Sequence, residues 1–219
     1  MPLYQAGPST RVPRLGRVCL RDGLNLSAGQ RVGLFGGSFN PAHEGHLHVA
    51  ETARVRLQLD RVVWLVSPQN PLKSDKAPSL EARMKDAARL ARGPSMQVSD
   101  VESRLGTRFT IDTLMALKAR HRGVHFVWIM GSDNLAGFHR WRGWRDIMRL
   151  MPVAVVARPG SLIDARLSPA ARVFARARVP SSRAATLATS STPAWVYLRA
   201  PLNPASSTAL RARDGAPKS

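Results

Sequence analysis

Two histidines, His43 and His46, stand three positions apart where a glycine-rich segment runs into a predicted helix. Residues at this spacing share one side of the first helical turn, and each imidazole, neutral or charged, can donate hydrogen bonds to phosphate oxygens. Gly36 and Gly37 precede them at the end of an apolar strand, and glycine lets phosphate oxygens approach the backbone closely. The segment FGGSFNPAHEGH, residues 35–46, therefore predicts a phosphate-binding site at the carboxyl edge of a sheet, where open α/β sheets bind ligands.

This segment has two competing interpretations. The glycine pair can be an ordinary strand-to-helix turn with one structural histidine, or the two histidines can be metal ligands. The metal site is disfavoured because Glu44 is the only other ligand type nearby, and it should point elsewhere on the helix. The combination of two glycines, Pro41 and two histidines favours phosphate binding over an ordinary turn.

Short apolar strands alternate with helices through most of the chain. Strands are predicted at residues 31–36, 61–66, 96–101, 124–130, 152–157 and 194–198. Helices are predicted at residues 44–57, 80–91 with Ser79 as N-cap, 110–121, 144–150, 168–178 and 206–213. Residues 179–193, rich in Ser, Thr and Ala, are predicted to form a loop. The alternation predicts parallel βαβ units, and hence an α/β fold with a single doubly wound parallel sheet and helices on both faces.

Composition divides the chain into three parts. Residues 1–30 carry prolines and glycines without sustained periodicity and are predicted to be an irregular extension. Residues 31–213 should form one domain, followed by a polar tail at 214–219. No run approaches the roughly 20 apolar residues that span a bilayer, and residues 1–17 lack the apolar region of a signal peptide. We therefore expect no membrane partner and a cytoplasmic location, with which the single cysteine, Cys19, is consistent.

The net charge of +19, from 33 Lys and Arg against 14 Asp and Glu, favours anionic partners. These can be phosphorylated small molecules or nucleic acid, and composition alone does not choose between them. The arginines that support a basic nucleic-acid-binding protein are Arg166, Arg172, Arg176, Arg178 and Arg183. No recognised nucleic-acid-binding module accompanies them, so no specific nucleic-acid partner is expected.

The segment His43-Glu44-Gly45-His46 resembles the signature of the nucleotidyltransferase superfamily, whose members are adenylyl- and cytidylyltransferases with Rossmann-like folds. The longer string GGSFNPAHEGHLHVA is similar to the bacterial nicotinate-nucleotide adenylyltransferases in particular. Four more segments agree in content and order, at residues 66–73, 109–114, 131–141 and 206–211. The resemblance extends from about residue 32 to residue 213, nearly the whole predicted domain.

The resemblance implies transfer of AMP from ATP to nicotinate mononucleotide, giving nicotinate adenine dinucleotide and pyrophosphate, in NAD biosynthesis. Mg²⁺ should accompany ATP, held by phosphate oxygens and water. The residues expected to be catalytic are His43, His46 and Arg211. ATP is expected to contact Gly36, Gly37, Ser38, Phe39, His43, His46, Asp133, Ser206, Ser207, Thr208 and Arg211. The acceptor is expected to contact Lys73, Phe109, Thr110, Trp141 and Arg142.

Several of these residues also have a physical rationale. Ser206 to Thr208 open a predicted helix and offer hydroxyls and N–H groups to an anion, with Arg211 one turn on. The indole of Trp141 can stack on a pyridine ring, while Trp144 is expected in the core. Asp133 follows a strand and can bind ribose hydroxyls or cap the next helix.

The identity of the acceptor is the part of the reaction for which alternatives stay open. The resemblance implies that backbone amides near Thr110 and near Trp141–Arg142 bind the nicotinate carboxylate, and Phe109 stands where relatives carry tyrosine. Backbone donors survive that change, so activity is expected to be kept. The alternative acceptors are nicotinamide mononucleotide and phosphopantetheine, used by related transferases of the superfamily.

Overall fold

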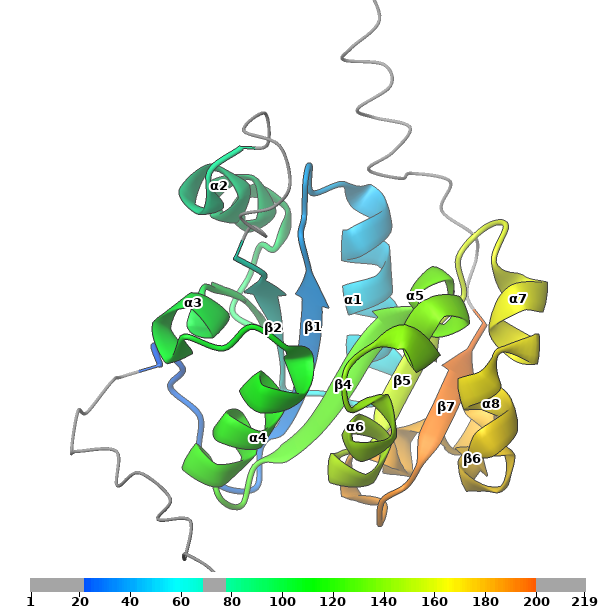
Figure 1. Ribbon diagram of the computed structural model, residues 1–219. Helices are drawn as coiled ribbons and strands as arrows, with labels where there is room; N and C mark the ends of the chain where they lie inside the picture. The colour runs from blue at the N-terminus through cyan, green and yellow to red at the C-terminus, as the bar shows by residue number, and fades with distance from the viewer. Residues whose placement is uncertain (1–21, 69–77, 200–219) are drawn as a thin grey trace, which may run out of the picture.

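The computed structural model of the chain describes residues 22–68 and 78–199, and its centre is one parallel sheet (Figure 1). The strands are β1 (Arg31–Gly37), β2 (Arg61–Val66), β3 (Met96–Ser99), β4 (His125–Gly131), β5 (Val153–Val156), β6 (Arg178–Val179) and β7 (Trp195–Leu198). Their order across the sheet is β3-β2-β1-β4-β5-β7-β6, and every neighbouring pair is parallel. The order reverses between β1 and β4, which makes this edge the switch point where open α/β sheets bind ligands.

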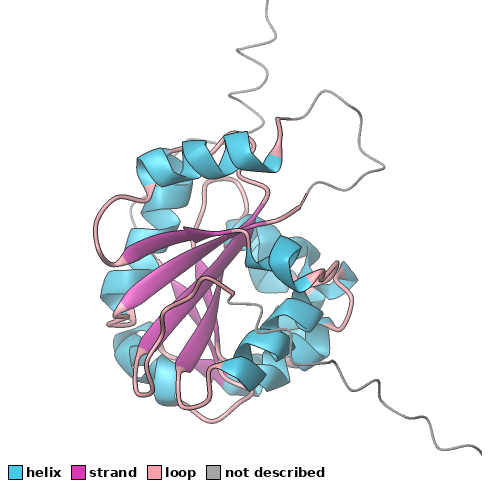
Figure 2. Cartoon of the chain, turned by 90° about the vertical axis from the view of Figure 1, so that its left-hand side faces the viewer, coloured by secondary structure: helices cyan, strands magenta, loops and turns pink. Residues whose placement is uncertain are grey.

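Helices cover both faces of the sheet (Figure 2). The α-helices are α1 (Glu44–Arg56), α2 (Leu80–Leu90), α3 (Val101–Leu105), α4 (Thr110–Arg120), α5 (Ser132–Gly137), α6 (Trp144–Leu150), α7 (Leu162–Leu167) and α8 (Pro169–Val173). Three 3₁₀ helices complete the described set: η1 (Phe138–Arg140), η2 (Ala175–Ala177) and η3 (Ser181–Thr189). The predicted α/β fold is confirmed.

The strands are apolar on both sides because each face carries its own core. In β2, Val63 and Leu65 pack into a cluster with α4 and α6 residues, while Val62 and Trp64 pack into a second cluster with α1 and α2 residues. Successive side chains of a strand point to opposite faces, so one apolar run serves both clusters. Trp144 is buried in the first cluster, as predicted.

Two local predictions at the ends of elements were wrong. The strand predicted at 96–101 ends at Ser99, because Val101 already begins α3. The helix predicted at 168–178 is only α8, followed by η2 and β6. Ser168 caps α8 and Pro169 starts it, but Phe174 leaves the helical conformation and packs its ring in the core. The indole N–H of Trp195 also donates to the Phe174 carbonyl at 2.8 Å, a tertiary contact that the sequence pattern does not reveal.

The segment at 179–193 was predicted to be a loop, and this was wrong for residues 181–189. They form η3, whose Ala184, Leu187 and Ala188 are buried against the sheet. Small alanines among Ser and Thr gave too weak an apolar pattern to identify this helix.

The described segment before β1 has no helix or strand but joins the packed body. Leu24 is buried in the first cluster, and the Asp22 carboxylate lies 2.8 Å from the ring of His121 at the end of α4. No helix within the described ranges is both long and apolar enough to cross a membrane.

Candidate functional site

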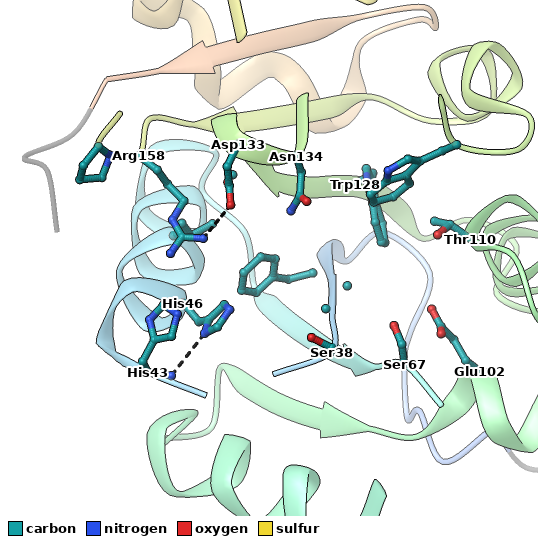
Figure 3. Close-up of a pocket in the computed structure, with 17 residues that line it drawn as sticks. Ser38, His43, His46, Ser67, Glu102, Thr110, Trp128, Asp133, Asn134 and Arg158 are labelled. Atoms are coloured by element: carbon teal, nitrogen blue, oxygen red, sulfur yellow. Dashed lines mark hydrogen bonds and ion pairs between the residues drawn. The ribbon is translucent and has the colours of Figure 1, made fainter. Parts of the chain in front are cut away.

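A cavity of about 600 Å³ opens at the switch point between β1 and β4. Figure 3 shows its two ends, which we name by their residues. The histidine end holds His43, His46, Asp133 and Arg158, and the tryptophan end holds Ser67, Glu102, Thr110 and Trp128. Trp141 also lines the cavity and belongs to the tryptophan end because its ring packs against that of Trp128. Gly36, Gly37 and Ser38 at the end of β1 also line the cavity. The structure thus brings together eight of the residues singled out from the sequence: Gly36, Gly37, Ser38, His43, His46, Thr110, Asp133 and Trp141.

His43 and His46 cap the first turn of α1 reciprocally. The Nδ1 atom of His43 accepts the backbone N–H of Gly45 at 3.1 Å, and Nδ1 of His46 accepts the backbone N–H of His43 at 3.2 Å. Because both Nδ1 lone pairs are engaged, the proton of each neutral ring lies on Nε2. The Nε2 atom of His43 is buried and has no partner among the described residues. The two rings therefore offer Nε2–H donors rather than lone pairs.

Both imidazoles are held neutral at pH 7. Burial, followed by the positive charge of Arg158, lowers the pKa of His43 to about 4, and Asp133 opposes this shift. Burial, followed by His43 and then Arg158, lowers the pKa of His46 to about 3. The ring centroids lie 3.8 Å apart, so charging one ring disfavours charging the other.

Arg158 supplies the cation of the histidine end and was not singled out from the sequence. Its Nη1 lies 3.0 Å from Oδ2 of Asp133, and its side chain is only 16% exposed. The Ser132 hydroxyl accepts the Arg158 N–H at 2.8 Å, and the Ser161 hydroxyl donates to the Arg158 carbonyl at 3.2 Å. A Cβ at Gly131 would overlap the Asp133 carboxylate, so glycine makes room for the pair. A basic residue directly after a predicted strand was the available signal.

Phe39 does not line the cavity. Its side chain is buried, with φ of +46°, and it packs edge-on against His46 with ring centroids 5.0 Å apart. Its ring also contacts Phe35 and Trp64 in the core. The Phe39 side chain therefore packs against His46, and only the Phe39 backbone is a candidate for phosphate contact.

At the tryptophan end, Trp141 is half-buried and packs edge-on against Trp128, with ring centroids 6.4 Å apart. Thr110 lines the cavity at the start of α4, whose N-cap residue, Phe109, makes no side-chain cap hydrogen bond. The first N–H groups of a helix have no intrahelical partner. The N-terminus of α4 therefore presents uncapped donors beside this end.

The side chains of Phe109 and Arg142 lie outside the cavity lining. The Arg142 guanidinium sits 4.5 Å above the centroid of the Phe109 ring, and this contact joins the two segments that sequence resemblance assigned to the acceptor. The contact therefore links the start of α4 to the segment that carries Trp141, and the binding of the acceptor by Phe109 and Arg142 stays a prediction.

Glu102 is a second cavity residue that the sequence did not single out. Burial raises the pKa of its carboxyl group, and a hydrogen bond with the Ser67 side chain acts in the opposite direction. Glu102 belongs to α3, a helix of five residues that the sequence pattern did not predict. No spacing signal connected it with the cavity.

Arg83 on α2 ties two of the cavity's loops together from behind. It is buried, and its guanidinium donates to the Ser38 and Ser67 carbonyls, each at 2.8 Å, and to the Pro78 carbonyl at 3.3 Å. Burial lowers the pKa of Arg83. Ser38 follows β1 and Ser67 follows β2, so one side chain fixes the chain at the carboxyl ends of both strands.

Lys73, Ser206, Ser207, Thr208 and Arg211 lie outside the described residues. Their assignment to the acceptor and to ATP stays a prediction.

The chain is similar to known proteins along most of its length. The cytidylyltransferase-like family model matches residues 34–213. A probable nicotinate-nucleotide adenylyltransferase of Caulobacter sp. (strain K31) is 67% identical over 185 residues, covering 84% of this chain and 98% of that protein. A protein of the same name from Cereibacter sphaeroides (strain ATCC 17025 / ATH 2.4.3) is 57% identical over 181 residues, covering 83% and 96%.

A similar fold is found in a solved structure, that of Plasmodium falciparum nicotinic acid mononucleotide adenylyltransferase complexed with NaAD. The TM-score is 0.63 at 16% identity, with 84% of this chain and 83% of that chain covered. At this identity the likeness concerns the fold, and it is the sequence relatives that establish the family. The chain belongs to the nicotinate-nucleotide adenylyltransferases, a family of nucleotidyltransferases, as the resemblance of residues 36–50 and the four further segments predicted.

Proposed function

We propose that this chain transfers AMP from ATP to nicotinate mononucleotide, forming nicotinate adenine dinucleotide and pyrophosphate in NAD biosynthesis. The observation that carries the proposal is the pair of neutral Nε2–H donors of His43 and His46, which share one end of the switch-point cavity with Arg158. The substrates are inferred from family membership, and the geometry of these donors explains how AMP transfer could be catalysed.

The reaction needs no general base from the protein. An oxygen of the acceptor's phosphate, already anionic at neutral pH, attacks the α-phosphorus of ATP, and the bond to the departing pyrophosphate breaks. The histidines could not serve as bases in any case, because each Nδ1 lone pair accepts a backbone N–H and each Nε2 carries the proton. Their role is to donate hydrogen bonds to phosphate oxygens as negative charge shifts toward the leaving group.

Arg158 extends this charge stabilisation. Its ion pair with Asp133 and the two hydrogen bonds to its backbone hold the guanidinium at the histidine end before any ligand binds. A preorganised donor loses little freedom when it meets the phosphates. The Asp133 side chain remains 47% exposed, which leaves it able to accept a ribose hydroxyl.

The acceptor's pyridine ring is assigned to the tryptophan end. Trp141 offers an indole there for stacking, and the uncapped N-terminus of α4 at Thr110 offers N–H groups to a carboxylate. Those donors favour nicotinate over the carboxamide of nicotinamide, whose NH₂ group would face other donors. Lys73 is proposed to assist from its loop.

ATP is proposed to enter with Mg²⁺. Mg²⁺ usually keeps several waters and is bound through one or two carboxylates and the substrate's phosphates rather than by a cage of protein ligands. The bound ion would neutralise phosphate charge. The Asp133 carboxylate, which lines the cavity, would be able to accept a hydrogen bond from a water bound to the ion. Ser206, Ser207, Thr208 and Arg211 are proposed to bind the β- and γ-phosphates.

The test is a panel of acceptors. Purified full-length protein is incubated with Mg-ATP and nicotinate mononucleotide, nicotinamide mononucleotide or phosphopantetheine, and pyrophosphate release is measured. The proposal expects the highest kcat/KM with nicotinate mononucleotide. A higher kcat/KM with phosphopantetheine would contradict the assignment of the tryptophan end.

A further inference from the structure

A second cavity, of about 490 Å³, lies between α7, α8, the edge strand β6 and its neighbour β7. It shares no lining residue with the first cavity. Figure 1 shows α7 and α8 beside β7, at the opposite end of the sheet from β2. The volume falls within the range of small-molecule sites in proteins.

The walls of this cavity are cationic. Arg166, Arg172 and Arg178, three of the five arginines that the sequence set apart as a possible anion-binding group, line it together. Among the described residues, no Asp or Glu lines the cavity and none of the three arginines makes an ion pair. Several positive charges around one hollow favour an anionic occupant.

The floor of the cavity is aromatic and has an unused hydrogen-bonding group. Trp195 and Tyr197 alternate along β7 and so face the same side of the sheet, and each is more than nine-tenths buried. The Arg178 guanidinium lies 5.4 and 5.9 Å from their ring centroids. Trp195 satisfies its N–H with the Phe174 carbonyl, whereas the Tyr197 hydroxyl has no partner among the described residues. Buried polar groups normally have one, so this hydroxyl is a place for a ligand oxygen.

The rim is apolar. Ile163 and Leu167 on α7 line the cavity and are 72% and 56% exposed, with Ala171 and Ala175 beside them. Large apolar side chains with this exposure could contact the apolar part of a ligand whose charged group pairs with the arginines. Three arginines, two aromatic rings and an apolar rim match the general composition of ligand sites, which are mostly apolar with a few fixed polar groups.

We propose that this cavity binds a small organic phosphate, in which a phosphate group is joined to a flat ring. The phosphate would pair with Arg172 and Arg178 near the Tyr197 hydroxyl, and the ring would lie against the apolar rim. Nucleic acid fits less well, because Arg176 and Arg183 lie outside the cavity that holds the other three arginines. The proposal does not depend on the proposed function of the first cavity.

The experiment is an NMR titration of the full-length protein with phenyl phosphate, and with inorganic phosphate and phenol as partial probes. We expect saturable amide shifts within residues 163–178 and 195–197, and an affinity for phenyl phosphate at least tenfold above that for either partial probe. Equal affinity for inorganic phosphate, or shifts confined to residues 36–46, would overturn the proposal. So would competition by single-stranded DNA with a steep salt dependence, or shifts that follow protein concentration and so reveal a second copy in the cavity.

Two variants locate the binding. Arg172→Gln removes one cation, and Tyr197→Phe removes only the unpartnered hydroxyl while keeping the buried ring. Each variant should lower the affinity for phenyl phosphate by about threefold or more. Arg149→Gln is the matched control, because Arg149 is 62% exposed on α6 and lies outside both cavities. Unchanged affinity in both cavity variants, or an equal loss in the control, would show that the anion binds elsewhere.

Discussion

The Nδ1 atom of His46 lies 3.2 Å from the backbone nitrogen of His43, and the two rings are tilted by 34° with centroids 3.8 Å apart. A capping box usually uses Ser or Thr with Glu or Gln, whose side chains satisfy two helix-terminal N–H groups. Here imidazoles make both bonds, and this leaves their Nε2–H groups for a ligand. In each ring, one nitrogen therefore caps the helix and the other is the proposed catalytic donor.

The dual role of His46 can be separated by two substitutions. His46→Ala removes both functions and should lower kcat by about 10²-fold or more, with a loss of about 1 kcal/mol in unfolding free energy. His46→Gln restores a capping-box acceptor at the same helix position, so stability should return toward wild type while kcat stays low. Steady-state kinetics and urea unfolding on the same samples decide this. Recovery of kcat in His46→Gln would make His46 a structural residue only.

The lowered pKa values predict that the histidines do not titrate near neutrality. With values of about 4 for His43 and about 3 for His46, both rings should stay neutral from pH 8 to pH 5. Their ring proton resonances in the free enzyme, followed by NMR, should show no titration in this range. A midpoint near 6.5 for either ring would contradict the neutral-donor mechanism. NMR is preferred to rate profiles because the substrates' phosphates titrate near pH 6 themselves.

The same shifts predict how stability depends on pH. In the unfolded chain these histidines bind protons near pH 6.5. In the folded chain their pKa values are about 4 for His43 and about 3 for His46. Stability from these rings is therefore fully present above pH 6.5 and falls as the pH drops from 6.5 toward 4. Urea unfolding at pH 7.5, 6 and 5 should show this decline, and His46→Gln, with one fewer titrating ring, should show a shallower one. Parallel curves for the two proteins would contradict the assignment.

Arg158→Ala should weaken ATP binding and also change the histidines. Removing a charge-assisted phosphate contact should raise the KM for ATP by about tenfold or more. Because Arg158 contributes to lowering both histidine pKa values, the variant should raise both. The measurements are KM for ATP and the NMR midpoints, with Arg149→Gln as an exposed-arginine control. An unchanged KM together with unchanged midpoints would remove Arg158 from the site.

Arg83 should control the shape of the cavity without touching a ligand. Arg83→Ala leaves the Ser38 and Ser67 carbonyls unpaired, so unfolding free energy should fall by about 2 kcal/mol or more and kcat/KM by about tenfold or more. Millimolar guanidinium should restore part of the kcat/KM by refilling the site. Arg89→Gln, exposed on the same helix, should change unfolding free energy by at most about 0.5 kcal/mol. Full activity in Arg83→Ala would show that the loops hold their shape unaided.

Substrate choice tests the tryptophan end. Nicotinate mononucleotide should be preferred over the nicotinamide form by at least about tenfold in kcat/KM, roughly 1.4 kcal/mol of transition-state discrimination. Trp141→Ala should raise the KM for both acceptors with little change in preference, because stacking does not distinguish acid from amide. Kinetics with both mononucleotides at saturating ATP provide the measurement. Equal efficiency would overturn the substrate assignment and leave the adenylyl-transfer chemistry standing.

The sequence alone determined the parts that depend on local pattern. Strand β2 and helix α6 have the bounds that apolar periodicity predicted, and the alternation of strands and helices predicted the parallel sheet. The His43–His46 segment identified the switch-point site because its glycines, its helix start and its two imidazoles are contiguous in the chain. Each of these signals lies within about one turn or one strand, where spacing is itself geometry.

Only the tertiary structure decided which distant residues join that segment. Arg158 is one arginine among many in a chain of net charge +19, and Arg83 is another, so residue type alone did not set either apart. Their roles follow from contacts across the fold: Arg158 meets Asp133, 25 residues away, and Arg83 meets the Ser38 carbonyl, 45 residues away. Glu102 reaches the cavity from a five-residue helix too short to leave a periodic pattern. The sheet brings these side chains together because parallel strands place their carboxyl ends at one edge, wherever their residues stand in the chain.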